Sequence, residues 1–262
     1  MSDSFSVRPR TVAIIQARMT SSRLPGKVLM PIAGKPAILF MHARVRRAKL
    51  IDAICLATSV DPSDDALAAC AEAAGLDVHR GSLDDVLDRF VGAARAHQAE
   101  IVVRLTGDCP LIDPEIIDQV VGLLAGGGYD YASNIDPPAF PDGLDVEAMT
   151  VAALETAAAE ARLGSEREHV TPFIRNHPER FRAGLVSSPV DLSALRWTVD
   201  YPDDLELVRR LTESVAGDPL LADRFDFLRA YDALGPTGAT HARNEGLAGS
   251  LARDADAPHK AV

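Results

Sequence analysis

The sequence predicts an α/β protein whose first half contains a mostly parallel, doubly wound sheet. Short apolar runs of strand length alternate with segments of helical periodicity throughout this half. Most of the helical segments begin at an Asp or Ser cap or at a proline. A loop rich in basic residues directly follows the first apolar run, where open parallel sheets bind their ligands. The alternation implies right-handed crossovers between neighbouring strands.

The individual elements follow from apolar periodicity and from start and stop signals. In the first half, strands are predicted at residues 12–15, 53–57, 77–79 and 101–105, and helices at residues 36–49, 61–74, 82–97 and 113–125. In the second half, a turn-rich segment leads to a run of period two at residues 144–147. Helices at residues 151–162, from 165, from 202 and at 225–234, with strands near residues 181–186 and at residues 197–199, complete the prediction.

The loop after the first strand is predicted to bind a polyanion. It contains three cations, two hydroxyls and a glycine, at Arg18, Ser21, Ser22, Arg23, Gly26 and Lys27. Basic side chains and backbone N–H groups at the end of a strand form a natural phosphate site. We therefore predict that Arg18, Arg23 and Lys27 contact the bound anion.

The distribution of charge indicates what kind of anion this is. Residues 4–51 contain no Asp or Glu and carry ten of the 27 Lys and Arg residues, whereas the whole chain has a formal net charge of −11. A nucleic-acid-binding protein is normally basic over a whole face, so the charge argues against a nucleic-acid partner and favours a nucleoside triphosphate. Four basic residues at 44–49 fit a solvated helix face instead.

Composition favours a cytoplasmic enzyme with no membrane partner. The chain has 262 residues, enough for one large α/β domain, and contains no apolar run of membrane-spanning length. Its first ten residues lack the apolar core of a signal peptide, and the three cysteines indicate neither disulfides nor zinc. Residues 1–10 are predicted to be disordered and residues 235–262 to form a mobile tail.

Two aspartates each follow a predicted strand, Asp108 after residues 101–105 and Asp200 after residues 197–199. Ligands bind at the carboxyl ends of strands, so both should face the crevice that holds the basic loop. A pair of carboxylates suits Mg²⁺, and this combination is what nucleotidyl transfer requires. We predict that Asp108 and Asp200 are metal ligands. The alternative is that each serves a turn or caps a helix, Asp200 lying just before Pro202.

Two interpretations are open for each of three further polar residues, Asp145, Glu147 and His169. Asp145 and Glu147 share one face of the predicted strand at residues 144–147, where they either bind acceptor hydroxyls or a metal, or form a solvated face. His169 either contacts substrate or only belongs to a helix start. Cys109 has no dedicated base nearby, and we interpret it as a small packing residue.

Six segments, in this order, carry a resemblance to a known family: AIIQARMTSSRLPGKVLMPIAGKP, RLTGDCPLIDP, YASN, GLDVE, EREHVTP and WTVDYPDDLELV. They resemble the SpsF-type branch of the cytidylyltransferase family, which is named for spore coat polysaccharide biosynthesis and is similar to CMP-KDO and CMP-acylneuraminate synthetases. The resemblance covers residues 11–234 and implies a GT-A-like nucleotide-diphospho-sugar transferase fold with a smaller inserted subregion. It also implies transfer of CMP from CTP to a sugar acid or related sugar, with Mg²⁺ as cofactor.

The resemblance also assigns roles to particular residues. It implies that the nucleotide and its phosphates are contacted by Ala17, Arg18, Ser22 and Lys27, with Arg23 beside them. It implies that Asp108 is the first metal ligand and Asp200 the second. Residues 11–128 would form the nucleotide-binding half, and residues 129–190 an acceptor and dimerisation subregion, so a homodimer is expected.

Within that subregion, the segment from Asn134 through His169 would shape the acceptor pocket, including Asp145 and Glu147. The chain departs from the family pattern at the residue expected to contact the nucleobase of CTP. Better-known synthetases have Gln-Gly-Asp where this chain has Thr-Gly-Asp at residues 106–108. Arg104 and Thr106 are the candidates to replace the glutamine.

The predicted activity is therefore Mg²⁺-dependent transfer of CMP from CTP to a sugar or a KDO-like or nonulosonate-like sugar acid, with release of pyrophosphate, for surface polysaccharide biosynthesis. The predicted catalytic residues are Arg18, Lys27, Asp108 and Asp200. Two alternatives stay open. One is a GT-A glycosyltransferase that consumes a nucleotide-sugar, although the Asp-x-Asp motif common in such enzymes is absent from residues 106–110. The other is a non-catalytic nucleotide-binding subunit.

Overall fold

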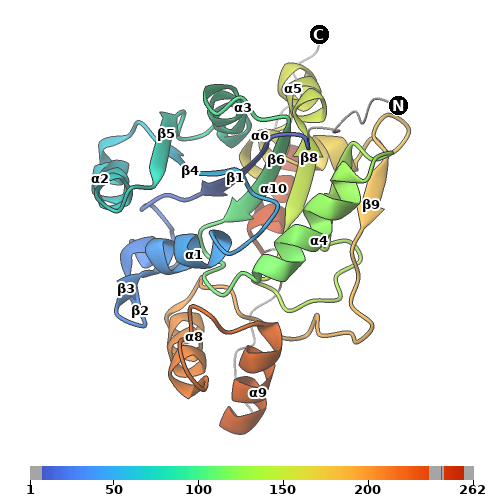
Figure 1. Ribbon diagram of the computed structural model, residues 1–262. Helices are drawn as coiled ribbons and strands as arrows, with labels where there is room; N and C mark the ends of the chain where they lie inside the picture. The colour runs from blue at the N-terminus through green and yellow to red at the C-terminus, as the bar shows by residue number, and fades with distance from the viewer. Residues whose placement is uncertain (1–7, 236–242, 244, 257–262) are drawn as a thin grey trace, which may run out of the picture.

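The structure is a computed structural model that describes residues 8–235, 243 and 245–256. Its centre is a seven-stranded sheet with the strand order β5-β4-β1-β6-β8-β7-β9 (Figure 1). The strands are β1 (Thr11–Gln16), β4 (Ala53–Ser59), β5 (Asp77–Gly81), β6 (Ile101–Thr106), β7 (Tyr131–Ser133), β8 (Glu147–Thr150) and β9 (Ala183–Leu185). A separate antiparallel pair consists of β2 (Pro31–Ile32) and β3 (Lys35–Pro36).

Helices cover both faces of this sheet. They are α1 (Ala37–Val45), α2 (Asp65–Ala73), α3 (Val86–Ala96), α4 (Pro114–Ala125), α5 (Val151–Glu160), α6 (Gly164–His169), α7 (Pro172–Arg175), α8 (Pro202–Ser214), α9 (Arg224–Leu234) and α10 (Glu245–Asp256). Two short 3-10 turns lie at Lys27–Leu29 and Pro62–Asp64. No helix among the residues described here is both long and apolar enough to span a membrane.

The period-two pattern of β1 explains how the two apolar layers form. Ala13 and Ile15 pack into the cluster that contains α1, α4, α8 and α9, whereas Val12 and Ile14 pack into the cluster with α3, α5 and α7. Figure 1 shows α1 and α4 on one side of the sheet and α3 and α5 on the other. Because β1 is buried on both faces, its sequence is a continuous apolar run, as expected for a central parallel strand.

The sheet is parallel except for β8, which runs antiparallel to both of its neighbours, β6 and β7. Two consequences matter for function. Gln16 at the end of β1 pairs with Thr106 at the end of β6, so the loops that follow these strands lie side by side. The antiparallel register also places Glu147 directly opposite Arg104. These observations confirm the predicted α/β class with a mostly parallel sheet.

The region before β8 differs from the prediction. The strand predicted at residues 144–147 begins only at Glu147, and Asp145 lies in the preceding loop. This loop turns at Gly143, whose φ of +106° suits glycine and where a Cβ atom would lie 2.6 Å from the backbone of Trp197. The turn and the close contact with residue 197 keep the loop out of the sheet, even though its alternating pattern resembles a strand.

The structure describes part of both segments that were predicted to be flexible, and in each it shows specific contacts. Residues 8–10 are not free, because Arg10 donates from its backbone N–H to Glu100 (2.8 Å) and from its guanidinium to the carbonyl of His97 (2.7 Å). In the predicted mobile tail, α10 packs against α6, with the backbone N–H of Ser165 donating to Asp254 at 3.0 Å. Residues 1–7, 236–242, 244 and 257–262 lie outside the described part of the chain. The division into halves at residues 128 and 190 stays a prediction.

Candidate active site

A cavity of about 500 Å³ lies at the carboxyl ends of β1 and β6. Its walls come from the loops after these two strands, from the segment that leads into β8, from α6 and α7, from the loop before α8, and from α10. It brings together every site residue predicted from the sequence except Asn134, namely Ala17, Arg18, Ser22, Arg23, Lys27, Arg104, Thr106, Asp108, Asp145, Glu147, His169 and Asp200. The prediction that these distant segments share one crevice is therefore confirmed.

Lys27 is the centre of the charged part of the cavity. It begins a 3-10 turn after Gly26, and its Nζ lies 2.8 Å from Asp200 Oδ1, 3.2 Å from Asp108 Oδ2 and 2.7 Å from the carbonyl oxygen of Val199. The three acceptors match the three protons of the ammonium group. Burial acts to lower the pKa of Lys27, but the two carboxylates outweigh it and raise this pKa above its ordinary value.

The loops that carry Asp108 and Asp200 are joined through their backbones. The carbonyl oxygen of Asp108 accepts from the backbone N–H of Val199 (2.7 Å) and from the hydroxyl of Thr198 (3.1 Å). Gly107 allows the same loop to approach β1, because a Cβ atom there would lie 2.8 Å from the Cβ of Ala17. Burial opposes ionisation of Asp108, but Lys27 and a hydrogen bond from Thr106 lower its pKa to about 2. Asp108 is therefore charged at neutral pH.

Asp200 does not cap the helix that follows it, so this part of the alternative interpretation is wrong. The strand predicted at residues 197–199 is wrong as well, because these residues lie in an irregular segment before α8. Asp204 supplies that cap, since its Oδ2 accepts from the backbone N–H groups of Asp200 (2.8 Å) and Tyr201 (2.9 Å). The carboxylate of Asp200 instead turns to three cations, with Oδ1 2.7 Å from Arg23 and 2.8 Å from Lys27, and Oδ2 3.0 Å from Arg196. Burial and nearby Asp108 act to raise its pKa, but Lys27 and Arg23 outweigh them and lower it.

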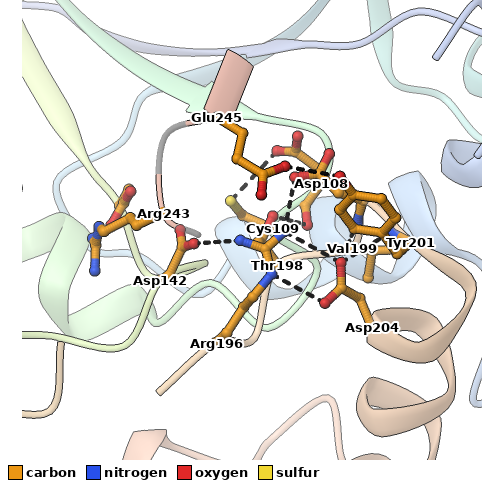
Figure 2. Close-up of polar contacts among 12 residues, drawn as sticks. Asp108, Cys109, Asp142, Arg196, Thr198, Val199, Tyr201, Asp204, Arg243 and Glu245 are labelled. Atoms are coloured by element: carbon orange, nitrogen blue, oxygen red, sulfur yellow. Dashed lines mark hydrogen bonds and ion pairs between the residues drawn. The ribbon is translucent and has the colours of Figure 1, made fainter. Parts of the chain in front are cut away.

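Arg196 is a site residue that the sequence analysis did not identify. Figure 2 shows its guanidinium between Asp142 and Asp204. The guanidinium lies 2.7 Å from Asp142 and 3.1 Å from Asp204, and it also reaches Asp200 at 3.0 Å. Because Arg196 holds both Asp200 and the capping Asp204, it orients the carboxylate that faces Lys27. The only signal in the sequence was its position four residues before Asp200.

Two carboxylates that meet at one ammonium also fit a divalent cation. Asp108 and Asp200 each place an oxygen within 3.2 Å of Lys27 Nζ, so their charges converge on a single point. Mg²⁺ accepts one or two protein carboxylates and completes its shell with water and phosphate oxygens. No cluster of three or more potential ligands occurs in the described part of the chain, so a metal here would depend on this pair and its substrate. The donor set thus fits Mg²⁺ better than zinc.

The remaining cations of the basic loop lie beside this pair. Arg23 stacks over the ring of Tyr201, with 5.2 Å from its guanidinium carbon to the ring centroid, and is 3.3 Å from Glu245. Arg18 is more open, with 43 % of its side chain exposed and Glu168 at 3.9 Å. Ala17 and Ser22 line the same wall. A polyanion in the cavity would therefore meet cations along one side.

The opposite wall contains a buried polar group around Glu147. Glu147 forms an ion pair with Arg104 and accepts from the hydroxyl of Tyr131 at 2.5 Å, while Arg104 also donates to Gln16 at 3.0 Å. Burial acts to raise the pKa of Glu147, but Arg104 and the hydrogen bond from Tyr131 lower it below its ordinary value. The proposal that Glu147 lies on a solvated strand face is therefore wrong. Tyr131 was not identified from the sequence.

Asp145 has a different electrostatic environment. Its carboxylate pairs with Arg243, but burial dominates, and together with nearby Asp142 and Glu147 it raises the pKa of Asp145 to about 7. Asp145 therefore changes charge near neutral pH, unlike Asp108.

Two predicted residues of the acceptor side have structural partners. Asn134 is buried outside the cavity, and its side-chain amide donates to the carbonyl of Leu144 while its oxygen accepts from the N–H of Val146, both at 2.8 Å. The prediction of Asn134 as a substrate contact is thus not supported. His169 does line the cavity, but its Nε2 lies 2.9 Å from Ser250 of α10. Burial and Arg104 lower the pKa of His169.

Thr106, the last residue of β6, and Cys109, in the loop that follows, contact each other. Thr106 lines the cavity, with its hydroxyl 3.2 Å from the sulfur of Cys109. Cys109 is buried, and burial raises the pKa of its thiol well above the ordinary value. A buried neutral thiol is a packing residue, as predicted.

The fold and the cavity together define an α/β protein in which a basic loop and two carboxylates meet at the edge of the sheet where open parallel sheets bind their ligands. Comparison with known proteins identifies the family within this class. The family model for cytidylyltransferases matches residues 12–212, and the chain belongs to this family.

Individual relatives agree with this assignment. The chain is 35% identical over 212 residues to the spore coat polysaccharide biosynthesis protein SpsF of Bacillus subtilis, covering 79% of this chain and 88% of that protein. It is similar to the structure of a cytidylyltransferase from Leptospira borgpetersenii, with a TM-score of 0.84 and 30% identity. The match covers 90% of this chain and 100% of that chain. A CMP:2-keto-3-deoxy-manno-octonic acid synthetase solved with CTP has the same fold, with a TM-score of 0.61 and 21% identity. The match covers 78% of this chain and 98% of that chain.

Proposed function

We propose that this cytidylyltransferase transfers CMP from CTP to a sugar or sugar acid and releases pyrophosphate. The observation that carries the proposal is the convergence of Asp108 and Asp200 on Lys27, next to Arg18 and Arg23 in one cavity. Nucleotidyl transfer needs carboxylates near the α-phosphate and cations near the departing pyrophosphate, and these residues supply both. The relative solved with CTP supports the choice of nucleotide.

In this mechanism the chain's own cations bind and orient the triphosphate. Arg18 and Arg23 contact the outer phosphates from the loop after β1, and Lys27 neutralises charge as the pyrophosphate departs. Asp108 and Asp200 would hold Mg²⁺, which supplies Lewis-acid activation of the α-phosphate. Arg196 keeps the second of these carboxylates in place through their 3.0 Å contact.

The acceptor would bind at the wall formed by β8, α6 and α7. Arg104 and Arg175 line this part of the cavity and offer positive charge to an acidic sugar, while Asp145 and Glu147 offer oxygens to hydroxyl groups. An acceptor that carries both a carboxylate and hydroxyls, such as a KDO-like or nonulosonate-like sugar acid, suits this combination. The name of the Bacillus relative supports a role in surface polysaccharide biosynthesis.

A homodimer through residues 129–190 belongs to the same proposal. Large apolar side chains are exposed there at Tyr129, Leu163, Leu185 and Val190, and β9 is the last strand of the sheet. Exposed apolar groups beside a sheet edge are typical of an association surface. Sedimentation of the purified protein as a monomer at micromolar concentration would contradict it. The predicted cytoplasmic location stays a prediction.

The activity is tested by following pyrophosphate release from CTP, ATP, GTP and UTP with a panel of sugars and sugar acids, and by identifying the product by mass spectrometry. We expect release with CTP and an acidic sugar, and its loss in Asp108→Ala. Free nucleotide formed from a nucleotide-sugar would favour a glycosyltransferase instead. Nucleotide binding without turnover, unaffected by loss of both Asp108 and Asp200, would favour a non-catalytic subunit.

A further inference from the structure

The C-terminal helix α10 lies against the candidate active site, although it is outside the residues that match the cytidylyltransferase family. Glu245, Gly246, Leu247 and Arg253 contribute to the lining of the 500 Å³ cavity. Figure 1 shows α10 behind β6 and β8, and the helix packs against α6. A segment distant from the family core therefore reaches the groups proposed to bind nucleotide.

The first residue of this helix pairs with the phosphate-binding loop. Glu245 Oε2 lies 3.3 Å from the guanidinium of Arg23 and accepts from the hydroxyl of Tyr201 at 2.8 Å. Arg23 is at the same time 2.7 Å from Asp200, so its guanidinium is held between two carboxylates. In Figure 2 the carboxylate of Glu245 points into the group around Asp108. A carboxylate thus occupies the place at Arg23 that a phosphate of the triphosphate would take.

Polar contacts hold the rest of the helix in position. Glu168 of α6 accepts from Ser250 (2.7 Å) and Arg253 (2.8 Å), and the N–H of Ser165 donates to Asp254 (3.0 Å). The largest apolar side chain on the helix exterior, Leu251, is 46 % exposed. Because partly exposed ion pairs and hydrogen bonds each contribute little net stability, the attachment is of a kind that a competing ligand can displace.

We propose that α10 is a strap that closes the nucleotide site in the absence of substrate, with Glu245 as a carboxylate substitute for a phosphate on Arg23. The inference rests on the proposed binding of a nucleoside triphosphate at the basic loop. Triphosphate and Glu245 compete for the same guanidinium, so nucleotide binding releases the amino-terminal end of α10, and closure of α10 weakens nucleotide binding by the same factor. The exchange replaces one carboxylate by a more highly charged phosphate group.

The test is a binding titration of the full chain with CTP, and separately with inorganic pyrophosphate, using Glu245→Gln. This variant keeps the size of the side chain and removes its charge. We expect its dissociation constants for both ligands to fall two- to five-fold, the range that corresponds to one partly exposed ion pair. Asp256→Asn is the matched control, because it removes one negative charge from an exposed position at the other end of the same helix. The control should bind like the wild type.

Hydrogen exchange provides an independent readout of the strap itself. In the wild type, addition of CTP should speed exchange of the backbone amides of residues 245–250. Equal dissociation constants in the wild type and Glu245→Gln, weaker binding by this variant, or slower exchange on adding CTP would each overturn the strap and leave the proposed activity intact. Failure of every form of the protein to bind any nucleotide would instead overturn the proposed function, and this inference with it.

Discussion

Lys27 and Asp200 lie 173 positions apart in the chain, yet their Nζ and Oδ1 atoms are 2.8 Å apart. The contact joins the basic loop after the first strand to the segment before α8, and the 3.2 Å contact of Lys27 with Asp108 adds the loop after β6. Both carboxylates are thus charged at neutral pH in a partly buried position. Because Lys27 is shared by two partly buried carboxylates, its loss should affect stability and catalysis more than the loss of an ordinary surface ion pair.

Replacing Lys27 by methionine should reduce both stability and turnover. The two carboxylates would be left without their shared cation, and breaking a buried ion pair in this way costs about 3–5 kcal/mol. The departing pyrophosphate would also lose a cation, so we expect kcat for pyrophosphate release to fall by about 100-fold or more. Chemical denaturation and initial-rate kinetics measure the two effects. Lys35→Met, which changes an exposed lysine on β3, is the control and should alter neither.

Loss of either carboxylate should remove metal binding while the fold is retained. Asp108→Asn and Asp200→Asn keep the size of each side chain but leave one charged oxygen ligand instead of two. We expect the affinity for Mn²⁺, used as a paramagnetic substitute for Mg²⁺ and measured by electron paramagnetic resonance, to fall at least about tenfold. Glu206→Gln, at an exposed position of α8, should bind Mn²⁺ like the wild type. Unchanged Mn²⁺ binding by both aspartate variants would rule out this pair as the metal site.

Asp145 should make stability depend on pH in the neutral range. Its pKa is raised to about 7 in the folded state, so between about pH 4 and pH 7 the folded protein retains a proton that the unfolded chain has lost. The contribution of Asp145 to the free energy of unfolding is therefore fully present below about pH 4. It is lost as the pH rises to about 7, and the total loss is about 4 kcal/mol. Asp145→Asn cannot titrate at this position, so its free energy of unfolding, measured by urea denaturation, should decline less steeply between about pH 4 and pH 7. Equal slopes for the two proteins would contradict the raised pKa.

Asn134 should matter for stability and not for substrate affinity. Its side chain satisfies the buried carbonyl of Leu144 and the N–H of Val146, so Asn134→Ala leaves both groups without partners. We expect the free energy of unfolding to fall by about 2–4 kcal/mol, since each unsatisfied buried group costs about 1–3 kcal/mol. The KM values for CTP and acceptor should stay within about twofold of the wild type. An increase in KM without loss of stability would restore Asn134 as a substrate contact.

The sequence predicted the basic loop and the strand-end aspartates because their signals are local. A buried parallel strand is a continuous apolar run, and a loop with three cations directly after it is visible without knowledge of the fold. The rule that ligands bind at the carboxyl ends of strands placed Asp108, which follows β6, in the same crevice as Lys27, and the structure confirms this placement. Asp200 lies in that cavity too, although residues 197–199 form no strand, so the rule gave its position for the wrong reason.

The structural features that the sequence did not reveal share a physical cause, which is that polar contacts between residues far apart in the chain leave no periodic pattern. The loop around Asp145 alternates like a strand but turns at Gly143 to contact the backbone of Trp197. Asn134 is a polar residue of the kind that often contacts substrate, but its side chain forms a hydrogen bond with the backbone of that same loop. The helix α10 attaches through Ser250, Arg253 and other polar groups, so its sequence resembles that of a solvated tail.

The sequence by itself thus determined the α/β class, the basic loop after β1 and the two candidate carboxylates, because each depends on neighbours within a few residues. Only the tertiary structure decided which partners those groups have. It showed that Asp204 caps α8 in place of Asp200 and that Arg196 orients Asp200. It also showed that Glu245 of α10 forms an ion pair with Arg23. These pairings depend on how separate loops meet at the edge of the sheet, and that geometry is set by the packing of the whole chain.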